Sequence, residues 1–331
     1  MRIATGQHFP ELAALDFVTP EIALPLRQRF YPLGFPLDVE TNSYDVLNAA
    51  AEAWKLFPQA FEEAAVRVSL TVVEGDEVPE QAEPRFFWRE HLMSISDGAQ
   101  NFVVCDFYRG FACGVVTRAA AMDHSSIRYR FLTPVAHTLI EQRRLAPVHG
   151  ALVVRNGHGV MLTGVSLAGK STLAYALSRA GWTYVSDDAI FLVRGNHERL
   201  AIGNPHFIRF REDARRLFPE LENHPTVVRP NGKPAIEVMT RDLPISVAPR
   251  CTIDHVVFLA RRQSGGVSLT HYPKDRALES WQAHIVLGTT NIRAAQLDCQ
   301  RRLAEATIWE LQYAMLDDAV ARLEQLADCG A

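Results

Sequence analysis

The chain has 331 residues, of which 48% are hydrophobic and 22% are charged, and its formal net charge is −4. This composition is ordinary for a globular protein, and the charge gives no electrostatic reason to expect a nucleic-acid partner. No stretch approaches about 18 uninterrupted apolar residues, so no membrane span is expected. The length favours two domains or one large one.

The first 145 residues predict a mixed α+β domain with a sheet. Four aromatic side chains in this region fit core packing better than a recognition surface: Trp54, Phe86, Phe87 and Trp88. In chain order, the predicted elements are a helix capped by Asn42-Ser43, a strand over residues 66–72, a hairpin over residues 102–116 and a helix over residues 133–139.

The cysteines and the N-terminus favour a cytoplasmic protein. Residues 1–8 lack the long apolar core of a signal peptide. The cysteines are scattered, odd in number and without a C-x-x-C pair, which favours neither a metal site nor a disulfide and fits a reducing compartment. They are Cys105, Cys113, Cys251, Cys299 and Cys329. The first two lie in apolar runs and are expected to be buried.

The most informative segment fits the phosphate-binding pattern G-x-x-x-x-G-K-[ST]. Residues 160–162 before it predict a short buried strand, and residues 172–177 after it predict the start of a helix. A glycine turn in this setting directs backbone N–H groups and the positive end of the helix dipole at one point. Lys170 then supplies a cation for the β- and γ-phosphates, and Ser171 supplies a hydroxyl for Mg²⁺. The residues predicted to bind a nucleoside triphosphate are Gly164, Val165, Ser166, Leu167, Ala168, Gly169, Lys170, Ser171 and Thr172.

Two adjacent carboxylates follow the predicted helix. Residues 182–193 predict a strand interrupted by Asp187 and Asp188. A parallel strand beside the first would bring the pair next to the loop. One carboxylate could then hold Mg²⁺ together with Ser171, while the other accepts a proton from an attacking hydroxyl. The alternative is a solvated strand end with an ordinary Asp turn, although buried carboxylates among apolar residues are costly without a cation.

A histidine lies upstream of the loop. Residues 149–154 predict a strand, and residues 156–159 predict a tight turn into the strand before the loop. This hairpin would place His149 on a strand antiparallel to the one that enters the loop, at its near or its far end depending on register. On spacing alone, a lone histidine is more often a surface or hydrogen-bonded core residue than a catalytic one.

Together these residues resemble the catalytic domain of the HPr kinase/phosphorylase family. The resemblance covers about residues 149–193 without gaps and rests on His149-Gly150, Gly157-His158-Gly159-Val160, the glycine motif, Gly181 and Asp187-Asp188. It implies a fold similar to phosphoenolpyruvate carboxykinase and phosphorylation of a protein serine.

The resemblance also implies a role for each matching residue. Gly164 through Ser171 would cradle ATP and Mg²⁺. Asp188 would be the general base on the acceptor hydroxyl, with Asp187 close to the metal or the base. His149 would lie at the near end of its strand and support the base or the transferring phosphoryl group.

Two segments depart from the family pattern. Residues 206–211 have no Glu in register with the family's Mg²⁺-binding Glu, and residues 247–252 are the only counterpart of its arginine-rich capping loop. The chain is more similar to divergent HPr-kinase-related proteins, some of which phosphorylate peptide serines. A predicted strand over residues 309–314 and a closing helix over residues 316–326 are similar to the ends of those relatives.

The sequence therefore predicts an α/β protein with an N-terminal mixed α+β domain over residues 1–145 and a P-loop, HPr-kinase-like catalytic domain over residues 146–331. The leading hypothesis is an ATP- and Mg²⁺-dependent kinase that phosphorylates a hydroxyl, with a protein or peptide serine as the expected acceptor and a small molecule as an alternative. The second hypothesis is a nucleotide-binding regulatory or scaffold protein without phosphotransfer. Neither a nucleic acid nor a membrane is an expected partner, and a homo-oligomer is left open.

Overall fold

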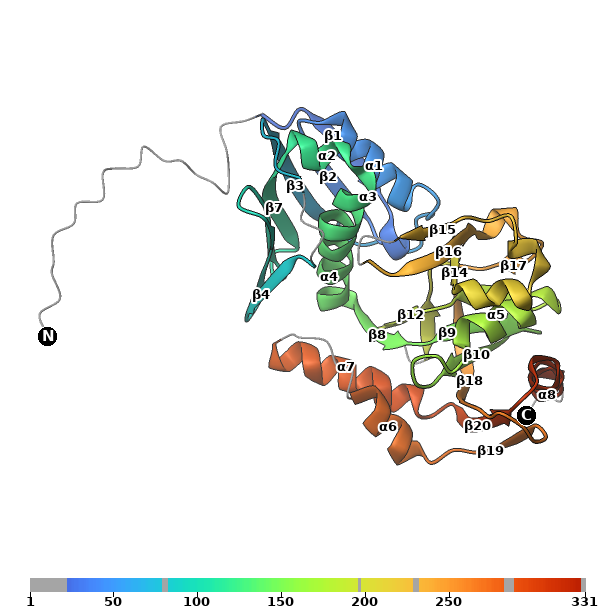
Figure 1. Ribbon diagram of the computed structural model, residues 1–331. Helices are drawn as coiled ribbons and strands as arrows, with labels where there is room; N and C mark the ends of the chain where they lie inside the picture. Colours follow the sequence, from blue (N-terminus) through green and yellow to red (C-terminus); the bar gives the residue numbers. More distant parts are fainter. Residues whose placement is uncertain (1–22, 79–82, 196–197, 229–231, 283–288, 329–331) are drawn as a thin grey trace, which may run out of the picture.

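The computed structural model describes residues 23–78, 83–195, 198–228, 232–282 and 289–328. Over these residues the chain is mixed α/β, with sheets of seven, ten and three strands (Figure 1). The α/β class predicted from sequence is confirmed at this level. The division into domains at residue 145 stays a prediction, and this residue begins the first strand of the ten-stranded sheet. The N-terminal residues 1–8 and Cys329 lie outside the described ranges.

The seven-stranded sheet belongs to the N-terminal part of the chain. Its order is β1-β2-β3-β7-β6-β5-β4, with β2, β3 and β7 mutually parallel and the remaining neighbours antiparallel. The strands are β1 (Leu26–Phe30), β2 (Leu37–Thr41), β3 (Val66–Val73), β4 (Arg85–Arg89), β5 (Leu92–Asp97), β6 (Asn101–Asp106) and β7 (Phe111–Thr117). The helices are α1 (Tyr44–Trp54), α2 (Arg118–Met122), α3 (His124–Ile127), a π-turn over Arg128–Leu132 and α4 (Thr133–Arg144).

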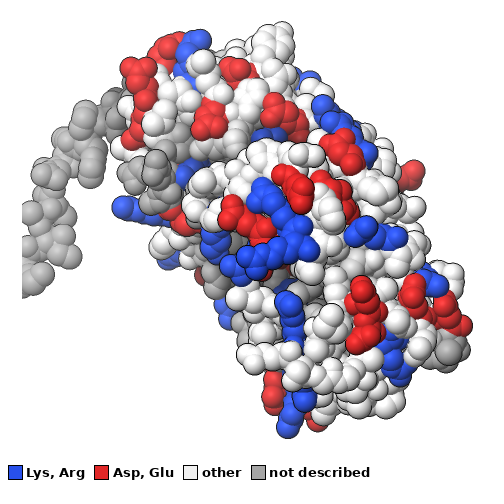
Figure 2. Space-filling model, turned by 45° about the vertical axis from the view of Figure 1, so that its right-hand side comes forward, with Lys and Arg blue, Asp and Glu red and all other residues white. Residues whose placement is uncertain are grey.

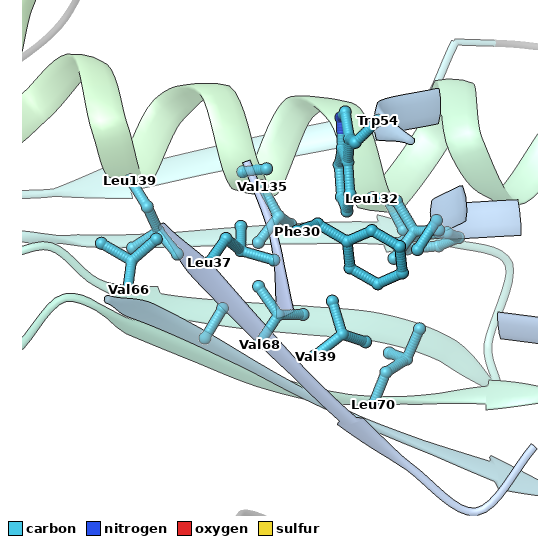
Figure 3. Packing of buried hydrophobic residues seen from close by; sticks show 14 of the residues in the cluster. Phe30, Leu37, Val39, Trp54, Val66, Val68, Leu70, Leu132, Val135 and Leu139 are labelled. Carbon is cyan, nitrogen blue, oxygen red and sulfur yellow. The ribbon is translucent and has the colours of Figure 1, made fainter. Parts of the chain in front are cut away.

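The core of this part follows from strand alternation. Val66, Val68 and Leu70 recur at every second position of β3 and are all buried, because alternate side chains of a strand point to the same face. The helices α1 and α4 cover that face, and Figure 3 shows their side chains meeting those of the strands. The Ser43 side chain accepts a hydrogen bond from the backbone N–H of Asp45 and so caps α1, as predicted.

The ten-stranded sheet belongs to the C-terminal part. Its main order is β17-β11-β9-β10-β18-β13-β12-β8, and β20 pairs with both β18 and β19. Its strands are β8 (Leu145–His149), β9 (Ala151–Arg155), β10 (His158–Thr163), β11 (Thr183–Ser186), β12 (Ala189–Val193), β13 (Leu200–Ile202), β17 (Ser246–Val247), β18 (Arg250–Arg261), β19 (Ser268–His271) and β20 (Thr307–Tyr313). A small sheet, β14 (Phe207–Phe210), β16 (Pro234–Met239) and β15 (Thr226–Val228), lies beside it.

Helices cover both faces of the ten-stranded sheet. In β10, Val160 and Leu162 pack in one apolar cluster, and Met161 between them packs in another. The first cluster includes residues of α5 and α8, and the second includes residues of α6 and α7. The alternation therefore produces a three-layer arrangement. The helices are α5 (Lys170–Arg179), α6 (Lys274–Gln282), α7 (Thr290–Leu303) and α8 (Leu316–Asp328).

The chain around His149 differs from the predicted hairpin. The sequence predicts one strand over residues 149–154, whereas β8 ends at His149 and β9 begins at Ala151. The strand β8 pairs with β12, so His149 does not lie on the strand antiparallel to β10. The predicted turn is also shorter, because Asn156 and Gly157 alone connect β9 to β10. Their φ values of +51° and +86° are those of a type I′ hairpin turn.

The strand with the Asp pair is also placed differently. Asp187 and Asp188 separate β11 from β12, which pair with different strands of the sheet. The strands β11 and β10 are parallel in direction, because each is antiparallel to β9. They are not neighbours, however, since β9 pairs with β10 through its hairpin and takes the adjacent position.

The prediction that the four N-terminal aromatic residues all pack in the core is wrong for two of them. Trp54 is buried, and Trp88 is half-buried against the same cluster. Phe86 and Phe87 are exposed, because β4 is an edge strand with neighbours on one side only. Cys105 and Cys113 are buried as predicted.

Charges of both signs are interspersed over the face shown in Figure 2. One cluster joins the C-terminal helix to the hairpin, where Arg155 contacts Glu324 at 2.7 Å and Asp328 at 2.9 Å. Such partly exposed ion pairs contribute little individually. None of the helices within the described ranges combines the length and apolar character that crossing a membrane requires.

Candidate active site

The segment between β10 and α5 forms a glycine loop, residues 164–169, with strained and exposed backbone. Leu167 has a φ of +71°, a conformation that is costly for a residue with a side chain. The side chains of Val165 and Leu167 are exposed, at 78% and 68%. Exposed apolar side chains on a strained loop at a helix N-terminus indicate a segment shaped for a ligand rather than for packing.

Gly169 ends the loop in a backbone conformation that favours glycine, with little space for a side chain. Its φ is +92°, and a Cβ atom there would lie 2.8 Å from the hydroxyl oxygen of Tyr313. That hydroxyl donates a hydrogen bond to the carbonyl of Ala168 at 3.0 Å, and burial raises the pKa of Tyr313. The strand β20 therefore fixes the loop from outside the motif.

Lys170 is folded back onto the loop that precedes it. Its Nζ atom donates to the carbonyls of Gly164 at 3.0 Å and Val165 at 3.3 Å, and the residue is 8% exposed. Burial lowers the pKa of Lys170, and the nearby Asp188 carboxylate acts in the opposite direction. A cation that is largely desolvated and held by neutral carbonyls is well suited to exchange those partners for phosphate oxygens.

The two aspartates are in different environments. Asp187 is 6% exposed, and its Oδ2 accepts a hydrogen bond from the backbone N–H of Arg209 at 2.9 Å. Burial raises the pKa of Asp187 to about 6. The Asp188 side chain is 61% exposed. Asp188 is therefore the carboxylate that an incoming ligand can reach directly.

His149 lies beside Asp188. Its Nδ1 is 3.3 Å from Asp188 Oδ1, because the β8–β12 pairing sets His149 opposite Ala189, the next residue along the chain. The Gly150 N–H donates to the Asp188 carbonyl at 3.0 Å, and the Thr163 hydroxyl donates to the His149 carbonyl at 3.3 Å. The second bond brings His149 to the end of β10, where the glycine loop begins. The predicted proximity of His149 to the pair is thus observed, although through a different strand pairing.

Ser171 lies beside Asp187, the first residue of the Asp pair. Its hydroxyl donates to the Asp187 carbonyl at 3.4 Å. Within the described ranges, no group of three or more His, Cys, Asp or Glu side chains forms a metal site. Mg²⁺ does not need one, since it is usually held by one or two carboxylates together with substrate phosphates and water. The Ser171 hydroxyl and a neighbouring carboxylate fit this requirement, and the assignment of Ser171 and Asp187 as metal ligands stays a prediction.

Two cavities flank the glycine loop, one at each end. The first, about 560 Å³, is lined by the loop start at Gly164, Val165 and Ser166, and by His149. The second, about 580 Å³, is lined by the loop end at Gly169 and by Thr172. The second cavity also carries Arg179, Arg216 and Arg261. The loop therefore separates a histidine-containing side from an arginine-containing side.

The contacts that bring several residues to this site could not be predicted from the sequence. Tyr313 lies in a predicted strand, but its contact with the loop depends on where β20 joins the sheet. The Arg209 N–H reaches Asp187 only through the position of the small sheet. The far walls of the first cavity come from β18, α6 and α7, which are distant in sequence from the motif.

Comparisons with known proteins give a distant relation only. No protein-family model matches the chain, and no curated protein matches it. Among solved structures, it is similar to the Hpr(Ser) kinase/phosphatase from Coxiella burnetii, with 15% sequence identity and a TM-score of 0.29, over 56% of this chain and 99% of that chain. A similarity of this strength establishes neither membership of a family nor an activity.

Proposed function

We propose that this protein is an ATP-dependent kinase that transfers the γ-phosphoryl group to a hydroxyl. The observation that carries the proposal is the convergence at the start of the glycine loop, where Lys170 contacts the Gly164 carbonyl and His149 contacts Asp188. A phosphate cradle and an exposed carboxylate beside a histidine are the two parts that phosphoryl transfer to a hydroxyl requires. The resemblance to HPr-kinase-related proteins adds a phosphoenolpyruvate-carboxykinase-like fold and a protein or peptide serine as acceptor to the proposal.

In the proposed reaction the chain's own residues position and neutralise charge. Mg-ATP, when bound, supplies the phosphoryl group and the metal charge. The N–H groups of the loop and of α5 contact the phosphates, and Lys170 turns from the loop carbonyls to the β- and γ-oxygens. Ser171 and Asp187 would hold the metal. Asp188 takes the proton of the acceptor hydroxyl as its oxygen bonds to the γ-phosphorus and the bond to the β-phosphate oxygen breaks, releasing ADP. His149 orients Asp188.

The direct test follows the label from [γ-³²P]ATP. Purified protein is incubated with Mg²⁺, labelled ATP, and serine-containing peptides or hydroxylated small molecules, and both ADP and labelled acceptor are measured. Labelled acceptor is expected in an amount equal to the ADP formed, and Lys170→Met should abolish it. Lys55→Met, which replaces an exposed lysine at the end of α1, is the matched control. ADP formation with no labelled acceptor in any reaction would contradict the proposal.

The second candidate is a nucleotide-binding regulatory or scaffold protein without phosphotransfer. Two observations favour it: Asp187 is buried with its pKa raised to about 6, and residues 206–211 lack an acidic metal ligand. A protein of this kind would bind Mg-ATP in a calorimetric titration, with no ADP formed, and nucleotide would change its protection from limited proteolysis.

A further inference from the structure

The first cavity has features that the nucleotide does not explain. The phosphates belong on the loop and beside Lys170. The transferred phosphoryl group must lie next to Asp188 and His149, and His149 lines the histidine-containing side. The nucleoside then extends past the other end of the loop, toward Thr172 and the arginine-containing cavity. The first cavity is therefore the space in which the acceptor can bind.

The walls of the first cavity are aromatic. Phe258 and Tyr272 stack with ring centroids 4.2 Å apart, and Trp281 continues the stack at 6.2 Å from Phe258. All three residues line the cavity. A stacked aromatic wall of this kind binds flat rings and cations rather than anions.

The polar groups of the walls favour a ligand that donates hydrogen bonds. Within the described ranges, Trp281 Nε1 and Gln300 Oε1 are buried and have no hydrogen-bond partner. Glu310 adds a carboxylate, and the described lining residues include neither Lys nor Arg. An amino or hydroxyl compound can donate to the Glu310 carboxylate and the Gln300 oxygen, and a hydroxyl oxygen can also accept from the Trp281 N–H, whereas Glu310 would repel a carboxylate or phosphate compound.

The size of the cavity favours a whole small molecule. A volume of about 560 Å³ lies within the range of small-molecule sites, about 300–1,000 Å³, and exceeds what one serine side chain would fill. We infer that this cavity is an acceptor site for a compact hydroxyl compound that carries a flat ring or an amino group, uncharged or cationic. The inference rests on the proposed kinase function for its chemistry, and on the cavity alone for binding.

Matched ligands test the charge preference. Tyramine and 3-(4-hydroxyphenyl)propionate share a phenol ring and differ in carrying an amine or a carboxylate, and pyridoxamine and glucosamine extend the amino series. Saturation-transfer NMR should show tyramine or another amine binding at least about tenfold more tightly than the carboxylate. Glu310→Gln should reduce this preference, whereas Glu305→Gln, at an exposed position, should leave it unchanged. If none of the three amines binds, or if the carboxylate binds as tightly, the inference is wrong.

Matched tryptophan variants test the place of binding. Trp281→Phe keeps a ring but shortens the aromatic wall, and should weaken amine binding at least about fivefold with unchanged affinity for Mg-ATP. Trp182→Phe is the control, because Trp182 Nε1 is also buried without a partner among the described residues but does not line the cavity. Weaker Mg-ATP binding in Trp281→Phe would assign the cavity to the nucleoside and overturn the inference.

The same samples separate this inference from the proposed function. If amines bind but no label is transferred from [γ-³²P]ATP to any acceptor, the cavity assignment stands and the proposed kinase function is wrong. If label is transferred to serine peptides alone, and the rate in Trp281→Phe equals that of the wild type, the proposed kinase function stands and the cavity assignment is wrong.

Discussion

Buried charges have different partners in the two parts of this protein that contain the large sheets. In the seven-stranded part, Asp97 is paired with Arg130, and both side chains are almost fully buried. Asp38 accepts hydrogen bonds from Arg29 and Arg27 at 2.7 Å, and the contact with Arg29 helps to lower the pKa of Asp38 to about 2. Asp97 and Asp38 therefore each have a cationic partner, whereas burial raises the pKa of Glu141 on α4 to about 8.

In the ten-stranded part, the buried charges at the glycine loop are hydrogen-bonded to backbone groups. Lys170 contacts backbone carbonyls, and Asp187 contacts a backbone N–H. Burial shifts both pKa values toward the neutral form. A buried ion pair contributes to the fold itself, whereas Lys170 and Asp187 lie together at a loop where a charged ligand could pair with them. This contrast predicts that removing the carboxylate of a buried ion pair lowers stability, whereas substitutions at the glycine loop and the Asp pair change binding or turnover and can raise stability.

The largest effect is expected for Asp188→Asn. The amide keeps the shape of the side chain but cannot accept the acceptor proton, so phosphotransfer should fall by about 10²–10⁴-fold while Mg-ATP binding is retained. Single-turnover transfer from [γ-³²P]ATP measures the rate. Turnover at the wild-type rate would place the base elsewhere, with Asp187 the first candidate. Loss of nucleotide binding would make Asp188 a metal ligand instead.

His149→Ala should have an effect of the same order or smaller. The imidazole lies 3.3 Å from Asp188 and on the wall of the first cavity. Its removal should lower the transfer rate by one to several powers of ten, within the roughly 10²–10⁴ of acid–base groups, with little change in the unfolding midpoint. His158→Ala, on the opposite end of β10, is the matched control. An unchanged transfer rate would reduce His149 to a structural residue.

The complementary experiment breaks a matched charge. Asp97→Asn removes the carboxylate charge that pairs with the buried Arg130 and should lower the free energy of unfolding by about 3–5 kcal/mol. Urea denaturation measures the change. The variant, studied below its unfolding midpoint, should keep its affinity for Mg-ATP. A variant that stays as stable as wild type but loses ATP affinity would contradict this prediction, because the Asp97–Arg130 pair would then contribute to nucleotide binding rather than to stability.

Asp187→Asn should do the reverse and stabilise the nucleotide-free protein. The folded-state pKa of Asp187, about 6, lies above the ordinary aspartate value of 3.8, so its charge costs stability as pH rises through that window. At pH 8 the cost is at most about 3 kcal/mol. The gain from Asp187→Asn should therefore be largest at pH 8 and fall by about half at pH 5. Unfolding curves at the two pH values check this, and a gain that increases toward acid would contradict it.

Much of the local structure follows from the sequence, and the arrangement of the site does not. The glycine motif fixes its own loop because glycines and a helix start act over a few residues, and α5 begins at Lys170, close to the predicted start. The meeting of His149 with Asp188 depends on the β8–β12 pairing, which joins residues far apart in the chain. Strand alternation says which face is buried but not which strand lies next to which. For the same reason the exposure of Phe87 on an edge strand, and the wall that Trp281 contributes to the first cavity, have no local signal.

The most direct measurement is a calorimetric titration of Mg-ATP into the wild type, Lys170→Ala and the control Lys55→Ala. If the glycine loop is a phosphate site, the wild type and Lys55→Ala bind alike. Lys170→Ala should then lose at least about 100-fold in affinity, or about 2.8 kcal/mol. Equal affinities for all three proteins, or no binding by the wild type, would contradict the nucleotide site on which the proposed kinase depends.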